Sequence, residues 1–191
     1  MPFRNQMNLA NRITLARIAF VPVFMVLLYF DRYWTNIAAT VIYTITALTD
    51  LVDGYLARKH NMVTDLGKIL DPVADKILVT AALVIFVQLG RLESAVVIVL
   101  IGRDLLIGAL RNVAAANGTV IAAGRGGKIK TVIQMIGVGC IIWKNMLYGL
   151  DILLIGQVIV YASVILSLHS GWEYYKNYAE KAGIAETTEN E

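Results

Sequence analysis

Charged residues are scarce in this sequence of 191 residues. They make up 16% of it, while hydrophobic residues make up 58%, and a soluble domain usually carries about 25% charged residues. This deficit argues against an ordinary soluble protein. It also excludes a disordered chain, which needs low hydrophobicity and high net charge. The net charge of +3 is dispersed along the chain, which does not indicate a nucleic-acid surface.

Cysteine and proline are also rare. A single cysteine, Cys140, permits no internal disulfide and supplies no metal-ligand spacing, so we expect a small buried side chain there. Three prolines exclude a collagen-like or proline-rich chain. The length predicts one domain over residues 1–191.

Long apolar stretches are abundant instead. A bilayer core about 30 Å thick is crossed by roughly 20 apolar residues in a helix, and six stretches come close to that length. We therefore predict an all-α integral membrane protein with six transmembrane helices, an interfacial segment at 1–11 and a polar tail at 180–191. No small-residue cleavage site follows the first stretch, so we expect it to be retained. The stretches are Ile13–Phe30, Asn36–Tyr55, Ile69–Leu89, Ala95–Ala115, Ile129–Leu147 and Ile152–Leu168.

The distribution of Lys and Arg predicts the orientation of these spans. Twelve of the 17 basic residues fall on one side, and three, Arg32, Arg91 and Lys144, fall on the other. Basic residues concentrate on the cytoplasmic side of a membrane protein. We therefore expect both termini and the two longer loops in the cytoplasm. The two remaining basic residues, Lys76 and Arg103, fall inside predicted spans.

Four carboxylates lie inside the second and third predicted spans, where charge is costly. Asp50 and Asp53 are three residues apart and Asp71 and Asp75 are four apart, so each pair shares one face of a helix. The two spans form a hairpin, which brings the pairs together near the cytoplasmic end. Such hard oxygen ligands suit Mg²⁺ or Mn²⁺ and can hold two ions. The alternative is a set of hydrogen bonds between helices.

The segment that joins the two pairs carries features typical of phosphate binding. Gly54 and Gly67 permit close approach of the backbone, either to a ligand or to a neighbouring helix. Arg58 can hold a phosphate oxygen. The backbone N–H groups after Gly67 open the helix of Asp71, and free N–H groups at a helix start favour an anion.

These residues resemble the signature of the CDP-alcohol phosphatidyltransferase family. The pattern DxxDGxxAR, eight residues, then GxxxDxxxD occurs without a gap from Asp50 to Asp75, and six spans also fit that family. The resemblance implies that Asp50, Asp53 and Asp71 bind two divalent metal ions, with Asp75 beside them as the general base. It also implies a homodimer. It places the cytidine diphosphate of the donor at Asp50, Asp53, Gly54, Ala57, Arg58 and Gly67.

The flanking sequence resembles bacterial members of the family that use sn-glycerol 3-phosphate as the acceptor alcohol. The resemblance therefore implies transfer of the phosphatidyl group from CDP-diacylglycerol to glycerol 3-phosphate with release of CMP, in the inner membrane. Mg²⁺ is favoured over Mn²⁺ by its availability. One departure is Asp104, because those members commonly have glutamate there. The resembling stretches are Asn11–Arg17, Tyr55–Lys59, Leu70–Lys76, Gly127–Thr131 and Ser170–Trp172.

A phosphorylated acceptor needs a cationic site beside the metals. Arg103 and Arg111 are about two helical turns apart and can line one side of the fourth span. Lys128 and Lys130 open the fifth span after two glycines, where backbone N–H groups and basic side chains meet. We predict that these four residues bind the acceptor phosphate. The alternative is that Arg111, Lys128 and Lys130 are interfacial residues that extend to the membrane surface.

The sequence leaves two other functions open. The same chemistry can use another acceptor, inositol phosphate or phosphatidylglycerol, and a lipid acceptor would not need the cluster of Arg111 and Lys128. A cation transporter would use the buried acids as its ion path. Transporters commonly have repeated halves, and no repeat is visible in this sequence.

Overall fold

Helices dominate the computed structural model of the chain. It describes residues 9–59, 65–116, 125–147 and 149–181, with side chains described for 14–49, 73–74, 76–114, 126–145 and 149–180. The predicted all-α class is confirmed for these residues. They form α1 (Leu9–Phe30), α2 (Tyr33–Lys59), α3 (Asp65–Gln88), α4 (Ser94–Ala116), α5 (Arg125–Trp143) and α6 (Ile152–Lys181), with a short antiparallel pair of strands, β1 (Met146–Leu147) and β2 (Leu150–Asp151), before α6.

The helices correspond to the six predicted apolar stretches, but their ends differ; α2, for example, continues past the predicted Tyr55 to Lys59. The predicted end of the fifth stretch at Leu147 is wrong, because α5 ends at Trp143. Lys144 has a φ of 46°, and this left-handed backbone conformation cannot continue a right-handed helix. The sixth helix continues beyond the predicted Leu168 to Lys181.

Both predicted terminal segments extend outside the described residues. Part of the segment predicted as interfacial, Leu9–Asn11, forms the first turn of α1, and residues 1–8 are not described. The predicted polar tail begins within the last turn of α6, and residues 182–191 are not described.

Length and apolar composition identify one candidate membrane span within the described residues. Ile152–Glu180 of α6 meets both criteria over 29 residues, and Thr14–Phe30 and Lys76–Gln88 are shorter apolar helices. α4 is long enough, but it contains Arg103, Asp104 and Arg111. The number of transmembrane helices therefore stays a prediction.

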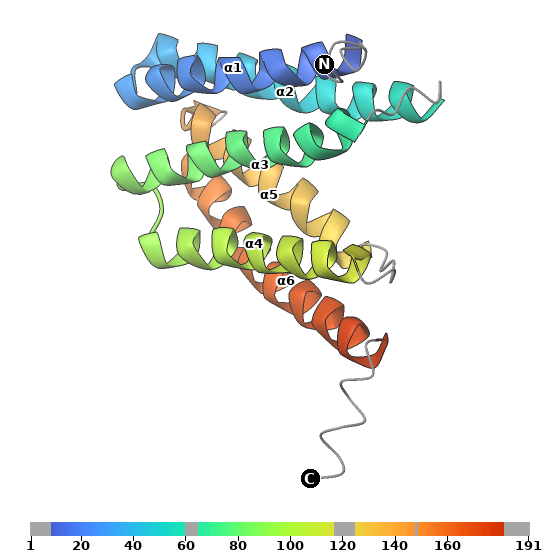
Figure 1. Cartoon of the computed structure of the whole chain (residues 1–191). Coiled ribbons are helices and arrows are strands. Elements are labelled where there is room, and N and C mark those ends of the chain that lie inside the picture. Colours follow the sequence, from blue (N-terminus) through green and yellow to red (C-terminus); the bar gives the residue numbers. More distant parts are fainter. Residues whose placement is uncertain (1–8, 60–64, 117–124, 148, 182–191) are drawn as a thin grey trace.

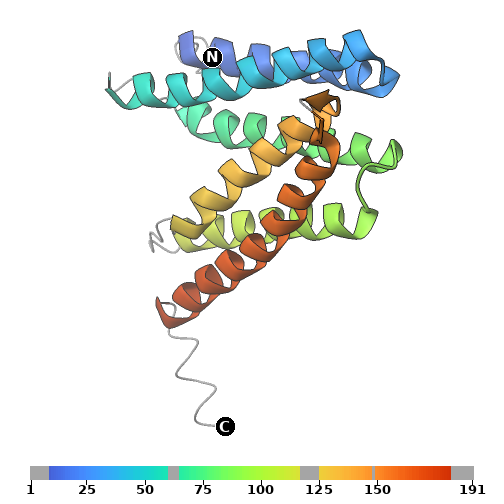
Figure 2. The same cartoon turned by 180° about the vertical axis from the view of Figure 1, so that it is seen from behind.

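The helices run back and forth between two ends of the molecule. α1 and α2 lie side by side, α3 packs along α1, and α4 follows beyond α3 (Figure 1). α5 and α6 pack closely together and cross the other helices at an angle, as the view from behind also shows (Figure 2). The α1–α2 turn, the α3–α4 turn and the β1–β2 hairpin lie at one end. The last turns of α2 and α4 lie at the other.

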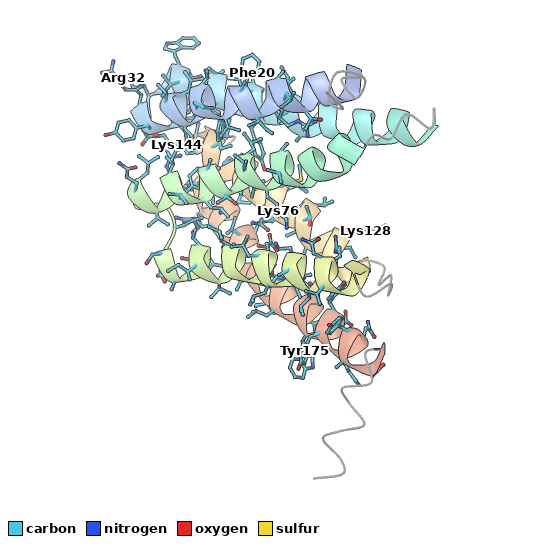
Figure 3. The ribbon with its side chains drawn as sticks, viewed as in Figure 1. Phe20, Arg32, Lys76, Lys128, Lys144 and Tyr175 are labelled. Atoms are coloured by element: carbon cyan, nitrogen blue, oxygen red, sulfur yellow. The ribbon has the colours of Figure 1, made fainter. Side chains whose placement is uncertain are left out.

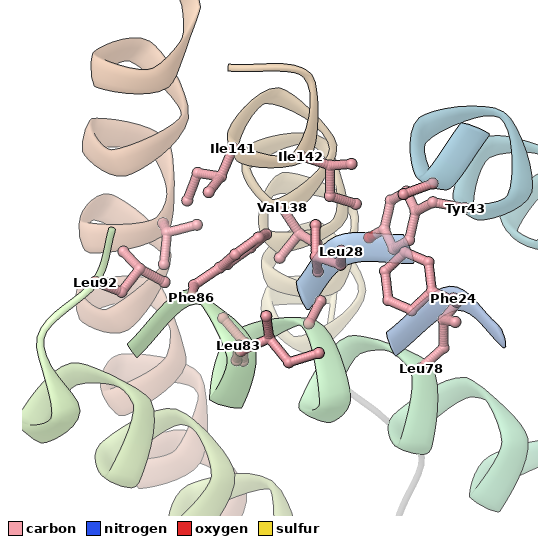
Figure 4. Packing of buried hydrophobic residues seen from close by; sticks show 14 of the residues in the cluster. Phe24, Leu28, Tyr43, Leu78, Leu83, Phe86, Leu92, Val138, Ile141 and Ile142 are labelled. Carbon is pink, nitrogen blue, oxygen red and sulfur yellow. The ribbon is translucent and has the colours of Figure 1, made fainter. Parts of the chain in front are cut away.

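An apolar core joins α1, α3 and α5 near the turn end of the molecule. Phe24 and Leu28 of α1, Phe86 of α3 and Val138 of α5 have no exposed side-chain surface, and they converge in Figure 4. The ring of Phe24 stacks on that of Tyr43 in α2, with centroids 6.2 Å apart. This packing fixes the helices around which the rest of the molecule is arranged.

Glycines allow α5 and α6 to pack in direct contact. A Cβ at Gly156 would lie 2.8 Å from the backbone nitrogen of Ile141 and 2.9 Å from the Cβ of Cys140. A backbone atom cannot move aside as a side chain can, so we expect Gly156→Ala to lower the free energy of unfolding by about 1–3 kcal/mol. Thermal unfolding in detergent measures this. Gly102→Ala is the control, because nothing lies within 4 Å of a Cβ there; equal melting temperatures for the two variants would contradict the prediction.

A polar cluster ties the three turns together. Oδ1 of Asp31, in the α1–α2 turn, accepts hydrogen bonds from Arg91 of the α3–α4 turn, from Lys144 after α5 and from Asn36 of α2. Arg91 is 5% exposed and also donates to the carbonyl of Ile141, at 3.0 Å. Two of the three basic residues predicted on this side of the membrane therefore pair with one acid.

The pairing of Asp31 predicts a loss of stability in acid. Burial raises the pKa of Asp31, but hydrogen bonds from Asn36 and Lys144 and the charges of Arg91 and Lys144 outweigh it, so the pKa lies below its usual value of 3.8. The stability gained above the unfolded-state pKa is lost as the pH falls through the lower folded-state pKa. At pH values below about 4, the melting temperature should therefore decrease. The Asp31→Asn variant should not show this decrease, because it lacks the carboxylate. The same acid-induced decrease in both proteins would contradict the assignment.

Candidate active site

The four predicted metal ligands belong to the adjoining ends of α2 and α3. Asp50 and Asp53 lie in the last three turns of α2, and Asp71 and Asp75 lie in the first three turns of α3. A helical backbone keeps each pair on one helix face. Their side chains lie outside the described residues, as do those of Ala57 and Arg58 and the surroundings of Gly54 and Gly67.

A cavity of about 630 Å³ lies beside these positions, within the size range of small-molecule sites. Thr46 lines it one turn before Asp50, and Ala74 and Lys76 line it on either side of Asp75. Described residues of all six helices contribute to its walls. The cavity therefore lies between the aspartate-bearing helices and the helices that carry the predicted acceptor residues.

Positive charge predominates in this cavity, which favours an anionic ligand. The four residues predicted to bind the acceptor phosphate all line it, and that role stays a prediction. Figure 3 shows Lys76 between α3 and α4, and Lys128 near the first turn of α5. The basic residues that line the cavity among those described are Arg17, Lys76, Arg103, Arg111, Lys128 and Lys130, and the acidic ones are Asp104 and Glu173.

Arg103 connects α4 to α6. Its Nε donates to the carbonyl of Ser167 at 2.9 Å, and its two terminal nitrogens donate to the hydroxyl of Ser170 at 2.7 Å and to Oδ1 of Asp104 at 3.0 Å. The side chain is 14% exposed. A guanidinium has five N–H groups, so two remain for a ligand.

Lys130 forms a buried ion pair across the cavity wall. Its side chain is 2% exposed, and its Nζ lies 2.8 and 2.9 Å from the two carboxylate oxygens of Asp104. Lys130 therefore does not extend to a membrane surface, which was the alternative interpretation of this residue. Asp104 also accepts from Arg103, so one carboxylate holds two cations.

Lys76 lies between the aspartate motif and the cationic cluster. It directly follows Asp75, and its Nζ donates to the backbone carbonyl of Asp104 in α4, at 3.3 Å. A Cβ at Gly108 would lie 3.2 Å from this Nζ. The absence of a side chain at Gly108 therefore leaves room for the ammonium group.

Arg111 and Lys128, like Lys76, are exposed basic residues of the cavity. The guanidinium carbon of Arg111 lies 5.9 Å from the ring centroid of Tyr174, a distance at which a cation and an aromatic ring attract. Lys128 is exposed in the first turn of α5. Both are accessible to a ligand that enters from water.

Lys76, Asp104 and α6 contribute to the cavity although the sequence pattern predicted no site role for them. For α6, one sequence pattern could have predicted that the helix contributes to the site. Buried polar side chains recur on this helix at spacings of three or four, which places them on one face. The sixth span was predicted from apolar residues alone, so it ended at Leu168, before the last two members of this stripe. Its members are Ser163, Ser167, Ser170 and Tyr174.

The chemistry of the four aspartates fits a divalent cation. Carboxylate oxygens are the hard ligands that Mg²⁺ and Mn²⁺ prefer. No group of three or more His, Cys, Asp or Glu that could hold a metal occurs among the residues with described side chains. The four aspartates lie outside that set, and they are the candidate ligands.

Comparison with known proteins links most of the chain to one family. Residues 7–169 match the family model of the CDP-alcohol phosphatidyltransferases. The chain is 41% identical over 184 residues to the CDP-diacylglycerol–glycerol-3-phosphate 3-phosphatidyltransferase of Bacillus subtilis (strain 168), covering 90% of this chain and 95% of that protein. Similar proteins of the same name come from Pseudomonas fluorescens, 35% identical over 92% of this chain and 95% of that protein, and from Shigella flexneri serotype 5b, 32% identical over 88% and 93%.

Proposed function

The chain belongs to the CDP-alcohol phosphatidyltransferase family, and on this premise we propose that it transfers the phosphatidyl group of CDP-diacylglycerol to sn-glycerol 3-phosphate. The products are phosphatidylglycerol phosphate and CMP. The observation that carries the proposal is the cationic cavity beside the aspartate motif. A small acceptor that carries its own phosphate needs such a cavity, whereas a lipid acceptor does not.

Binding of the two substrates is divided between the two sides of the cavity. On the α2–α3 side, Gly54, Ala57, Arg58 and Gly67 would hold the cytidine diphosphate, with Asp50 and Asp53 beside them. On the α4–α5 side, Arg103, Arg111, Lys128 and Lys130 would hold the acceptor phosphate. With this division, the acceptor hydroxyl would lie near Asp75. Asp75 directly precedes Lys76, which lines the cavity.

The aspartates would bind two divalent metal ions, with Mg²⁺ favoured over Mn²⁺ by availability. Asp50, Asp53 and Asp71 would be ligands, and Asp75 would lie beside them. Bound metal ions would neutralise the pyrophosphate and polarise the phosphorus atom under attack. Four carboxylates in one place cannot all ionise without such compensation.

The transfer then forms one bond and breaks one. The acceptor hydroxyl oxygen attacks the phosphorus atom that carries the diacylglycerol, and the bond from that phosphorus to the CMP oxygen breaks. Asp75 takes the proton of the hydroxyl group as the general base. The cationic cluster restrains the acceptor, so that a step between two molecules becomes a step within one complex.

Six transmembrane helices in the inner membrane, with the termini and the active site on the cytoplasmic side, complete the proposal. The outer faces carry large exposed apolar side chains, such as Ile98, Leu106 and Ile165, which is 72% exposed; a soluble monomer rarely exposes such surfaces. The 30 residues of α6 span about 45 Å, so its last turns extend beyond the bilayer core. A homodimer through the membrane helices is part of the proposal.

The test is the product made by the purified protein in lipid–detergent micelles with Mg²⁺. CDP-diacylglycerol is supplied with glycerol 3-phosphate, inositol phosphate or phosphatidylglycerol, and CMP and the lipid product are measured for each. We expect CMP release to require glycerol 3-phosphate. CMP release that is independent of glycerol 3-phosphate, or that is faster with another acceptor, would overturn the acceptor assignment.

A further inference from the structure

We infer that Asp104 is a positioning residue for the acceptor phosphate: its carboxylate holds the Lys130 ammonium and the Arg103 guanidinium together, so that their remaining N–H groups bind that phosphate jointly. The inference rests on the proposed function. It adds an acidic residue to a site that otherwise attracts anions through basic ones.

Asp104 is the point at which three helices meet in the cavity wall. Both of its carboxylate oxygens accept from Lys130 of α5, at 2.8 and 2.9 Å, and Oδ1 also accepts from Arg103, at 3.0 Å. Its backbone carbonyl accepts from Lys76 of α3, at 3.3 Å. Three cations from α3, α4 and α5 are therefore placed around one residue of α4.

These contacts leave donors available for a ligand. A lysine ammonium has three N–H groups, and Asp104 offers Lys130 two acceptor oxygens, so at least one N–H remains. Two of the five N–H groups of Arg103 also remain, because three donate to Ser167, Ser170 and Asp104. A lysine that is already held loses less conformational freedom when a phosphate binds than a free lysine does. Asp104 thus supplies preorganisation at the cost of some attraction for the anion.

Coulomb's law alone predicts the opposite role. Lys76, Arg103, Lys130 and Asp104 together carry a charge of +2, and removal of the carboxylate raises it to +3. If Asp104 acted only as a negative charge near a phosphate, its loss would tighten acceptor binding. If it positions the two cations, its loss weakens acceptor binding. The direction of the change decides between the two roles.

The experiment is the steady-state kinetics of Asp104→Asn, with each substrate varied in turn. We expect the KM for glycerol 3-phosphate to rise about 10- to 100-fold, the range for lost charge-assisted hydrogen bonds, with the KM for CDP-diacylglycerol unchanged. Asp104→Glu should restore most of the acceptor affinity, because it restores the carboxylate. Asp151→Asn is the matched control: Asp151 lies before α6 at the opposite end and caps that helix, and asparagine caps as well as aspartate.

A double-mutant cycle tests whether Asp104 acts through Lys130. In the Lys130→Met background, Asp104→Asn should change the acceptor KM less than it does in the wild-type background, since one of the two cations that Asp104 positions is gone. Equal effects in the two backgrounds would overturn the inference. A structural role alone would change stability and both KM values together.

The outcomes separate this inference from the proposed function. A wild-type protein that makes no phosphatidylglycerol phosphate contradicts the proposed function. An active wild type whose Asp104→Asn variant has an unchanged or lower acceptor KM contradicts the positioning role alone. Should Asp104→Asn fail to fold, Asp104→Ala is the second variant, because its smaller side chain admits water to Lys130, and the same result is expected.

Discussion

Replacing Asp75 by asparagine is expected to lower the rate of CMP release by about 10²- to 10⁴-fold, the contribution of a general base. An amide has nearly the size of a carboxylate but cannot take the proton of the acceptor hydroxyl. It can still offer an oxygen to a cation, so we expect metal binding to persist. Turnover is measured as CMP released at saturating concentrations of both substrates. Metal binding is measured separately, as the rise in melting temperature on addition of Mg²⁺.

The two measurements together define the role of Asp75. Asp151→Asn, at the opposite end of the molecule, serves as the control for an Asp-to-Asn change. Normal turnover in Asp75→Asn would remove the general-base assignment. Loss of the Mg²⁺-dependent stabilisation would instead show that metal binding requires the Asp75 carboxylate.

Replacing Arg103 by methionine is expected to raise the KM for glycerol 3-phosphate by about 10²-fold, which corresponds to about 2.7 kcal/mol. Methionine fills similar space, but it removes the charge and the bonds to Ser167, Ser170 and Asp104. Arg103→Lys should recover little, because one ammonium cannot reproduce the fork of donors that reaches α6 and Asp104 at once. The KM for each substrate is measured for wild type and both variants.

A uniform loss of activity would not support this role for Arg103. We expect the KM for CDP-diacylglycerol to change little, since that substrate is assigned to the α2–α3 side. Arg32→Met is the matched control, because Arg32 is exposed in the α1–α2 turn, far from the cavity. Equal increases in both KM values would show that Arg103→Met disturbs the packing of α4 against α6 and not the acceptor site.

The helices could be predicted from the sequence because their signal is local. Apolar stretches separated by short polar joints located all six, and only the ends differed. The end of α5 depends on the backbone conformation of Lys144, whose ammonium pairs with Asp31, 113 residues away. α6 continues past Leu168 through polar residues, of which Ser170 and Glu173 line the cavity, and a criterion for apolar residues cannot detect such a continuation.

Some parts of the candidate site could be predicted from the sequence, and others could not. The spacing from Asp50 to Asp75 identified the family and the residues that share helix faces, because spacing along one helix fixes the face. The same argument placed Arg103 and Arg111 on one side of α4. It could not reveal that Asp104 holds Lys130, 26 residues away, or that Arg103 reaches Ser170, 67 residues away.

The sequence by itself determined the class of fold, the family and the aspartate motif, since each depends on residues within a few helical turns of one another. Only the tertiary structure decided which charges meet. An ion pair between helices depends on how those helices pack, and helix packing is set by contacts such as those of Gly156 with Ile141. The arrangement of Lys76, Arg103 and Lys130 around Asp104 follows from that packing, and no periodicity in the sequence encodes it.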